Sequence, residues 1–120
     1  MARSDFAWIP FFEDFNSGNT VATRPFQIEG TPFGDGYLLI QQFDVEVSTH
    51  RIQINGTDLP GLDLTPMPSG NPDRVWLTWM DRIPPDILRS GANRLTIRRS
   101  EQTDEFFAIA NVAVHWRELG

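Results

Sequence analysis

The chain has 120 residues, of which 40% are hydrophobic and 22% charged, and its formal net charge is −6. This length and composition are typical of one globular domain, so residues 1–120 are expected to fold as a single unit. The absence of cysteine excludes disulfides, thiol catalysis and iron–sulfur clusters, and the acidic balance argues against a domain that binds nucleic acid through its phosphates.

Short strand-like segments, separated by clusters of Gly, Pro, Asn and Asp, run along the whole chain. The predicted strands are residues 6–12, 20–28, 37–47, 50–54, 75–83, 93–99 and 106–116. This number and spacing predict an all-β fold, an antiparallel jelly-roll β-sandwich of about eight strands.

The amino-terminal segment predicts neither a secretion signal nor a membrane span. Its apolar run, residues 6–12, is short and is interrupted by Pro10. Both kinds of segment need a longer uninterrupted apolar run. We therefore expect a cytoplasmic location or a place in a larger complex, and no membrane partner.

Two connections carry recognisable turn chemistry. Asn55-Gly56 is the preferred pair of a type I′ hairpin turn, in which both central residues take a positive φ. With Thr57 it also forms a glycosylation sequon, which matters only in a secreted chain. Within residues 82–93 a proline is expected to open one short helical turn, which Gly91 would end.

The last predicted strand alternates clearly between apolar and polar residues. Its core-facing side would carry Phe106, Ala108, Ala110, Val112 and Val114. The other side would carry Asn111, His115 and Arg117 and would face water.

Residues 37–116 contain an apolar strand, a hairpin that ends in Asn55-Gly56, an aromatic strand, a Leu-x-x-Gly-x-Asn-x-Leu-x-Ile element and a final strand. The element consists of Leu88, Gly91, Asn93, Leu95 and Ile97. In this order the segments resemble galactose-binding-like jelly rolls, which occur in many carbohydrate-binding modules and in the sugar-binding domain of large glycosidases. The resemblance implies a β-sandwich. It carries over no ligand residue, because the matching residues are turn and core residues and the superfamily has many functions.

An exposed tryptophan with polar neighbours is the predicted binding constellation. Trp76 and Trp79 lie three residues apart on one strand, so they point to opposite faces and at most one of them faces the core. The exposed ring would stack on a sugar, and Arg82, Asp81 or Arg51 would fix its hydroxyls. The alternative is that these aromatic residues pack in the core.

Asp35, Asp44 and Glu46 are candidate ligands of a structural calcium, and Asp44 and Glu46 share one face of a predicted strand. A loop with repeated Asp residues is absent, so the pattern favours solvated carboxylates, and no other cofactor is expected. The two histidines, His50 and His115, lack the spacing of a zinc site and are expected on strand surfaces.

Asp81 and Glu105 are the pair of carboxylates to consider for glycoside hydrolysis. The sequence has no local motif around them, and it has no serine elbow, Walker loop, dinucleotide glycine motif or HExxH. We therefore expect no enzyme activity.

Two functions remain open. One is a non-catalytic module that binds a glycan or another polar ligand. The other is a structural or assembly subunit whose exposed edges and aromatic amino-terminal strand contact a partner protein or further copies of the chain in a homo-oligomer.

Overall fold

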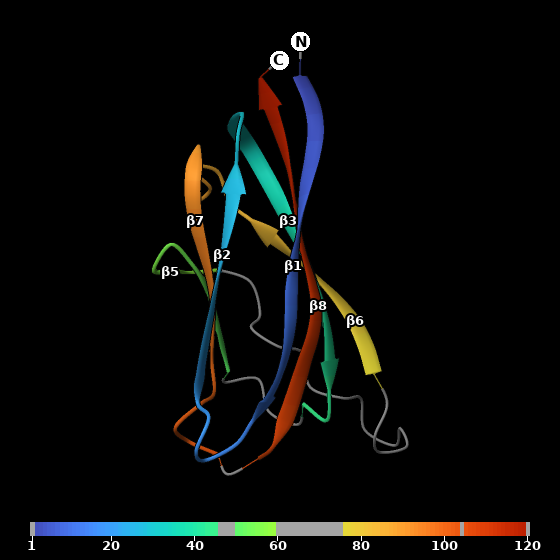
Figure 1. Cartoon of the computed structure of the whole chain (residues 1–120), viewed down its shortest axis with the longest axis vertical. Helices are drawn as coiled ribbons and strands as arrows, with labels where there is room; N and C mark the ends of the chain where they lie inside the picture. Colours follow the sequence, from blue (N-terminus) through green and yellow to red (C-terminus); the bar gives the residue numbers. More distant parts are fainter. Residues whose placement is uncertain (1, 46–49, 60–75, 104, 120) are drawn as a thin grey trace.

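Two four-stranded antiparallel sheets form the molecule (Figure 1). The computed structural model describes residues 2–45, 50–59, 76–103 and 105–119. The strands are β1 (Ala2–Phe15), β2 (Val21–Ile28), β3 (Thr31–Phe43), β4 (Arg51–Ile54), β5 (Thr57–Asp58), β6 (Trp76–Ile83), β7 (Gly91–Arg98) and β8 (Phe107–Leu119). Sheet 1 has the order β1-β8-β3-β6 and sheet 2 the order β2-β7-β4-β5. This is the arrangement of an eight-stranded jelly roll, so the predicted all-β sandwich is confirmed. None of the described segments is a helix that could span a membrane.

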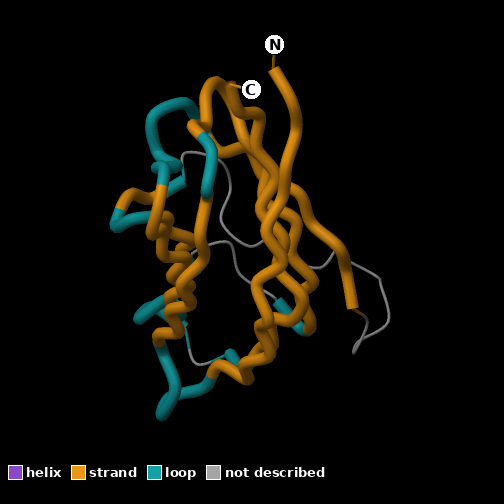
Figure 2. Tube along the Cα trace, turned by 45° about the horizontal axis from the view of Figure 1, so that its top comes forward, coloured by secondary structure: helices purple, strands orange, loops and turns teal. Residues whose placement is uncertain are grey.

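The two sheets enclose one apolar core, and loops join the strands at both ends of the sandwich (Figure 2). Alternate side chains of each strand enter the core, as the period of two in a strand requires. In β4 and β7 these are Ile52, Ile54, Leu95 and Ile97, all fully buried. Each such side chain stabilises the fold by about 1.5–3 kcal/mol relative to an exposed one.

A β-bulge in β8 reverses the alternation that the sequence predicts. Asn111 has a φ of 55°, and at this point the pairing of β8 shifts register against both β1 and β3. Phe107 and Ile109 therefore face the core before the bulge, and Val112 and Val114 face it after the bulge. An inserted residue turns the side chains that follow it to the opposite face of the sheet. A prediction from strict alternation does not include such a change.

The bulge overturns part of the prediction for the last strand. Phe106 precedes β8 and is 66% exposed. Ala108 and Ala110 lie on the outer face of sheet 1 and not in the core, although both are buried there. The outward position of His115 and Arg117 is confirmed.

The hairpin between β4 and β5 has the predicted turn. Asn55 and Gly56 have φ values of 54° and 81°, as a type I′ turn requires. The Leu59 N–H donates to the Ile52 carbonyl at 3.0 Å, and both side chains are buried in the core.

Side-chain amides hold the connection between β6 and β7. Asn93 is buried, and its Nδ2 donates to the carbonyls of Arg89 (2.8 Å) and Gly91 (3.1 Å). Its Oδ1 accepts the Arg89 N–H at 2.9 Å. Asn55 donates to this same Oδ1 and to the Ile87 carbonyl, at 2.8 and 2.9 Å. The asparagines that carry the family resemblance are therefore structural residues.

The expected short helical turn in residues 82–93 is wrong, because the segment forms turns and bends without a helix. Asp86 has a φ of 72°, which a right-handed helix does not admit. The amides of Asn55 and Asn93 also bond backbone groups that a helical turn would pair within itself.

Candidate functional site

The structure does not gather the predicted binding residues into one site. Trp76 and Arg82 lie on the outer face of sheet 1, six residues and therefore about 20 Å apart along β6. Trp79 and Asp81 point inward from the same strand, so the prediction that the two tryptophans lie on opposite faces is confirmed. Arg51 lies in sheet 2.

Asp81 is a buried carboxylate on the inner side of sheet 1. Its Oδ1 accepts the Arg82 N–H at 2.8 Å, and its Oδ2 has no hydrogen-bond partner among the described residues. Burial raises the pKa of Asp81, because desolvation disfavours the charged form. Asp81 therefore lies inside the sandwich, away from a surface where a ligand could bind.

The predicted calcium ligands are also separate. Asp35 accepts a hydrogen bond from Arg82 at 2.9 Å, and this bond lowers the pKa of the Asp35 carboxyl. Asp44 follows the other end of β3, about 30 Å of strand away, and Glu46 lies outside the described residues. In the part of the chain that the structure describes, no three His, Asp or Glu side chains are grouped to hold a metal ion.

His50 is buried, and its expected position on a strand surface is wrong. It lies on the same side of the chain as Ile52 and Ile54, and its ring stacks on Phe107 at 4.0 Å. Its Nδ1 accepts the Ser100 N–H at 2.9 Å, so Nε2 carries the hydrogen and donates it to the Glu105 carboxylate. Because both ring nitrogens are occupied inside the protein, this pair ties β4 to the loop before β8.

Asp81 and Glu105 do not form a pair of catalytic carboxylates. Asp81 aligns with Leu38 and, through it, with Val114 in β8, whereas Glu105 precedes the start of that strand. The separation along β8 is about 25–30 Å, and glycoside hydrolysis needs about 5–10 Å. The described residues thus place this pair too far apart for that chemistry.

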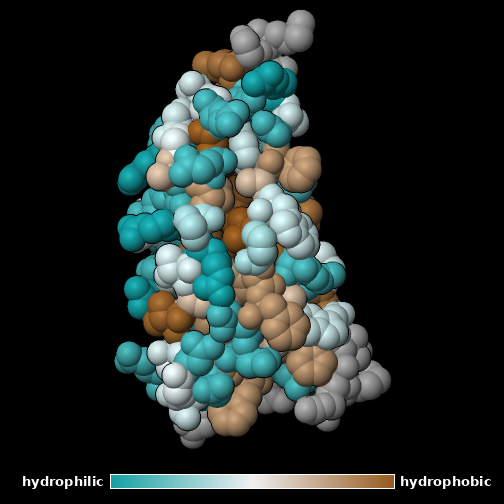
Figure 3. Space-filling model, viewed as in Figure 1, coloured by the Kyte–Doolittle hydropathy of each residue, from teal (hydrophilic) through white to brown (hydrophobic). Residues whose placement is uncertain are grey.

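The outer face of sheet 1 carries exposed apolar side chains in cross-strand rows. The register gives four rows: Phe6, His115, Tyr37 and Arg82; Trp8, Ala113, Leu39 and Met80; Phe12, Ala110, Gln41 and Thr78; and Asp14, Ala108, Phe43 and Trp76. We name as the aromatic face the exposed apolar members Phe6, Trp8, Phe12, Tyr37, Trp76 and Met80. Figure 3 shows apolar side chains at the surface on the side of sheet 1 and mostly polar ones over sheet 2.

Rings from the two edge strands meet over the middle of sheet 1. Phe12 of β1 and Trp76 of β6 have ring centroids 6.3 Å apart, and Trp76 also contacts Phe43 at 5.1 Å. These rings lean over the strands between them and cover Ala108 and Ala110, which are each only 5% exposed. The last row of the outer face is therefore an aromatic cluster with small residues beneath it.

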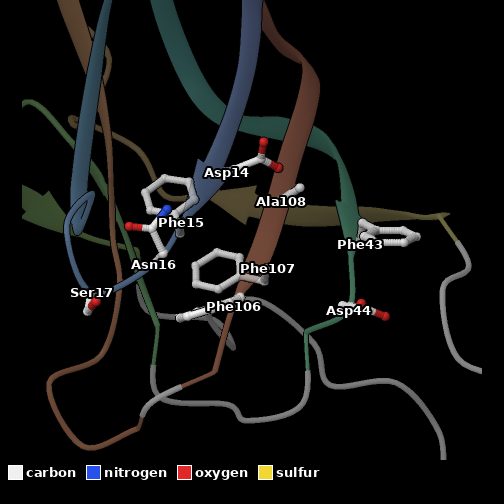
Figure 4. A pocket seen from close by; sticks show the side chains of 9 residues that line it. All are labelled: Asp14, Phe15, Asn16, Ser17, Phe43, Asp44, Phe106, Phe107 and Ala108. Atoms are coloured by element: carbon white, nitrogen blue, oxygen red, sulfur yellow. The ribbon is translucent and has the colours of Figure 1, made fainter.

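A pocket of about 520 Å³ opens next to this cluster, at the end of sheet 1 where β8 begins between the ends of β1 and β3 (Figure 4). It is lined by Asp14, Phe15, Asn16, Ser17, Phe43, Asp44, Phe106, Phe107 and Ala108. Phe15 and Phe107 stack with ring centroids 4.7 Å apart and form a rigid wall. In Figure 4, Phe43 and Asp44 lie across β8 from Phe15.

The pocket combines aromatic surface with polar groups that can serve a ligand. Phe106 is exposed, so its ring is accessible for stacking. The carboxylate of Asp14 and the hydroxyl of Ser17 make no hydrogen bond with the described part of the chain, and Asn16 uses its Oδ1 to accept the Gly18 N–H. Polar groups and apolar side chains share the lining about equally, which suits a ligand that has both polar groups and an apolar face.

Sequence patterns predict little of this pocket. Of its lining residues, Asp44 is a predicted calcium ligand, and Phe106 and Ala108 are predicted core residues. The available signals were the Phe106-Phe107 doublet at the start of a strand and the polar Asn16-Ser17 turn. Neither shows that the two segments meet, because they are about 90 residues apart in the chain.

A family model described as "Family of unknown function (DUF7383)" matches residues 5–118. No curated protein is similar to the chain in sequence.

Solved structures with a similar fold come from larger proteins and from an isolated module. Dimeric latent PorU from Porphyromonas gingivalis has a TM-score of 0.65 at 13% identity, over 98% of this chain and 13% of that one. A β-porphyranase of glycoside hydrolase family 86 from the human gut bacterium Bacteroides plebeius has a TM-score of 0.59 at 14% identity, over 89% of this chain and 20% of that one.

The CBM36-1 domain of a multidomain xylanase, from the hindgut metagenome of Trinervitermes trinervoides, has a TM-score of 0.51 at 5% identity. Here the match covers 92% of this chain and 96% of that domain. The chain thus spans a small part of the two larger proteins and nearly all of the module. At these identities the similarity shows a shared fold, a β-sandwich like that of a carbohydrate-binding module.

Proposed function

The chain belongs to the family of unknown function DUF7383, and we propose that it is a non-catalytic module that binds a glycan in the pocket at the end of sheet 1. The observation that carries the proposal is the convergence of accessible aromatic rings and uncommitted polar groups in one cavity of about 520 Å³. This volume is in the usual range of small-ligand sites and suits one or two sugar units.

The chemistry of the pocket supports a sugar as the ligand. The apolar face of a pyranose ring stacks on an aromatic ring, here Phe106, while its hydroxyls need hydrogen-bond partners. Asp14 accepts such bonds, Ser17 both donates and accepts, and the Asn16 amide donates. A wholly apolar ligand would leave these groups without partners, which costs binding free energy.

The shared fold adds to this proposal. The similarity to the CBM36-1 domain covers almost the whole of both chains, so a module of this size and architecture occurs as a unit attached to a xylanase. The galactose-binding-like resemblance of residues 37–116 is part of the same argument.

Binding to neutral soluble polysaccharides, including xylan, galactan and glucan, tests the proposal by titration calorimetry. We expect Phe106→Ala and Asp14→Ala each to weaken binding by about tenfold, the effect of about 1.4 kcal/mol. Phe106 and Asp14 are exposed, so neither substitution should disturb the fold.

Phe6→Ala is the matched control, because Phe6 is as exposed as Phe106 but lies in the row farthest from the pocket. At protein concentrations at which both proteins are monomeric, its affinity should equal that of the unmodified chain. Absence of binding to every polysaccharide, or equal binding by Phe106→Ala and Phe6→Ala, would show that the pocket is not a glycan site.

A further inference from the structure

The part of the aromatic face that lies away from the pocket exposes large side chains side by side. Phe6, Trp8 and Phe12 on β1 are 61%, 55% and 68% exposed, and across the sheet Tyr37 and Met80 are 44% and 56% exposed. Monomeric soluble proteins rarely leave a contiguous apolar patch of more than a few hundred Å² open to water. Such a surface is typical of one that is covered by a partner.

We propose that this face is the contact of a symmetric homodimer, in which a second copy of the chain packs its sheet 1 against the first. The proposal is independent of the glycan pocket. Three properties of the face identify a second copy as the partner: its charge, its relief and its area.

Charge is the first property. The chain carries 16 acidic residues and a net charge of −6, so two copies repel each other wherever their acidic surfaces meet. The first three cross-strand rows contain no acidic side chain. Their basic members are His115, which stacks on Phe6 at 5.6 Å, and Arg82, whose charge is balanced by Asp35 at 2.9 Å. Two copies can therefore approach through this face without bringing acidic groups together.

Relief is the second property. The edge strand β1 presents the large ring of Trp8, and its neighbour β8 presents the small, partly exposed side chain of Ala113 in the same row. A two-fold axis makes each contact reciprocal, so the Trp8 ring of one copy can lie on Ala113 of the other, and the reverse. Sheets that pack face to face in this way lie about 10 Å apart with their strands nearly aligned.

Area is the third property. Four strands about 4.8 Å apart, over the six residue steps from Phe6 to Phe12, give roughly 400 Å² of flat surface per copy. The protruding rings add accessible area towards the roughly 800 Å² per partner of a standard stable interface. The row that contains Asp14 and borders the pocket lies beyond this area, so both pockets would stay open and a dimer could hold one polymer at two points.

Sedimentation velocity and light scattering over a wide range of protein concentrations test the proposal. We expect the unmodified chain to approach twice its monomer mass as concentration rises. Trp8→Glu places two acidic groups in the symmetric contact, and Met80→Glu does so at the opposite edge of the face. Each should weaken association at least tenfold. Trp8 and Met80 are more than half exposed, so both variants should keep the unfolding midpoint of the parent within a few degrees.

Val21→Glu is the matched control. Val21 is an exposed apolar residue of β2, an edge strand of sheet 2, and its replacement should leave the dimer intact. A chain that stays monomeric at all concentrations overturns the proposal, and so does a dimer that survives both sheet 1 substitutions or is lost in Val21→Glu. If the chain is monomeric and Trp8→Glu instead abolishes binding to the polysaccharides, the face is a glycan surface and the dimer is rejected.

Discussion

The two outer faces of the sandwich differ in chemistry although the two sheets share one core. On sheet 2, polar side chains pair across the strands: the hydroxyls of Thr23 and Thr96 lie 3.0 Å apart, and Arg98 donates to Gln53 at 3.1 Å. On sheet 1 the corresponding positions carry rings, such as Phe6 and Trp8. Sheet 2 presents a surface that water solvates well, whereas sheet 1 exposes apolar area that water does not.

This difference means that both proposed binding surfaces lie on the same sheet. Both sheets contribute alternate buried side chains to the core, so their two inner faces are alike in chemistry. The outward positions are free to vary without loss of the fold, and among the described strands the exposed aromatic rings all lie on sheet 1. The pocket and the proposed dimer contact both lie on that sheet. The predictions below test whether these outer rings serve binding and not the stability of the monomer.

The largest effect is expected where an aromatic ring faces inward. Phe15 is fully buried and stacks on Phe107 at 4.7 Å, so Phe15→Ala removes core contacts and leaves a cavity. We expect it to lower the free energy of unfolding by about 3–5 kcal/mol. Phe12→Ala, three residues earlier in the same strand but 68% exposed, should change the stability by less than about 1 kcal/mol.

Urea denaturation of the two variants measures this contrast within β1. Dilute protein is required, so that association through sheet 1 does not add to the stability of the unmodified chain. Equal losses in both variants would mean that the outer rings hold the monomer together, and the contrast between the two faces would then be wrong.

The second largest effect is expected at Asn93 of β7, whose side chain holds the connection that leads into sheet 2. Asn93→Ala removes the partners of the Arg89 N–H and of two carbonyls in a buried setting. We expect a loss of about 2–4 kcal/mol, because each group left without a hydrogen bond costs about 1–3 kcal/mol and some are reached by water. Gln27→Ala, an exposed residue of β2, is the control and should be nearly neutral in thermal and urea unfolding.

Local patterns in the sequence predicted the sandwich well. The apolar residues that alternate along β4 and β7 all lie on the inner side, since the period of two follows from strand geometry alone. The Asn55-Gly56 turn followed from the rarity of positive φ in other residues. Where one residue was inserted, at Asn111, the same reasoning failed, because a bulge has no fixed sequence signature.

The candidate site could not be predicted in the same way. Its walls come from residues 14–17, 43–44 and 106–108, which only the strand order of the jelly roll brings together. The predicted constellation around Trp76 relied on neighbours in sequence, and the pleat sends Trp79 and Asp81 to the other side of β6. Only Trp76 lies beside the pocket, through its contact with Phe43.

A smaller effect, which depends on pH, is expected at Asp81 on the inner side of sheet 1. Burial raises the pKa of this carboxyl in the folded protein above its unfolded value. The folded state therefore binds the proton more tightly than the unfolded chain. This contribution to stability is greatest at low pH and is lost as the pH rises from the unfolded pKa through the folded pKa.

Asp81→Asn imitates the protonated acid at every pH. It should therefore be more stable than the parent near neutrality, and the difference should shrink as the pH falls towards 3.8, the ordinary value of the group. Chemical denaturation at a series of pH values measures this difference in the free energy of unfolding. Titrating groups that both proteins share contribute equally to each and therefore cancel in the difference. Glu13, whose pKa is lowered by its bond to Arg24, is one such group. A difference that is constant across the series would contradict a buried charge at Asp81.

The smallest effect concerns single contacts on the two outer faces. A double-mutant cycle of Thr23→Val and Thr96→Val should give a coupling of about 0.5 kcal/mol, as expected for a cross-strand hydroxyl pair. A cycle of Phe6→Ala and His115→Ala on sheet 1, whose rings stack at 5.6 Å, should give a similar value in dilute protein. Equal couplings would mean that the polar and the aromatic pairs stabilise the monomer alike. If the sheet 1 coupling then grows with protein concentration while the sheet 2 coupling stays constant, the rings gain their additional interaction from a second molecule, and the difference between the faces lies in what they bind.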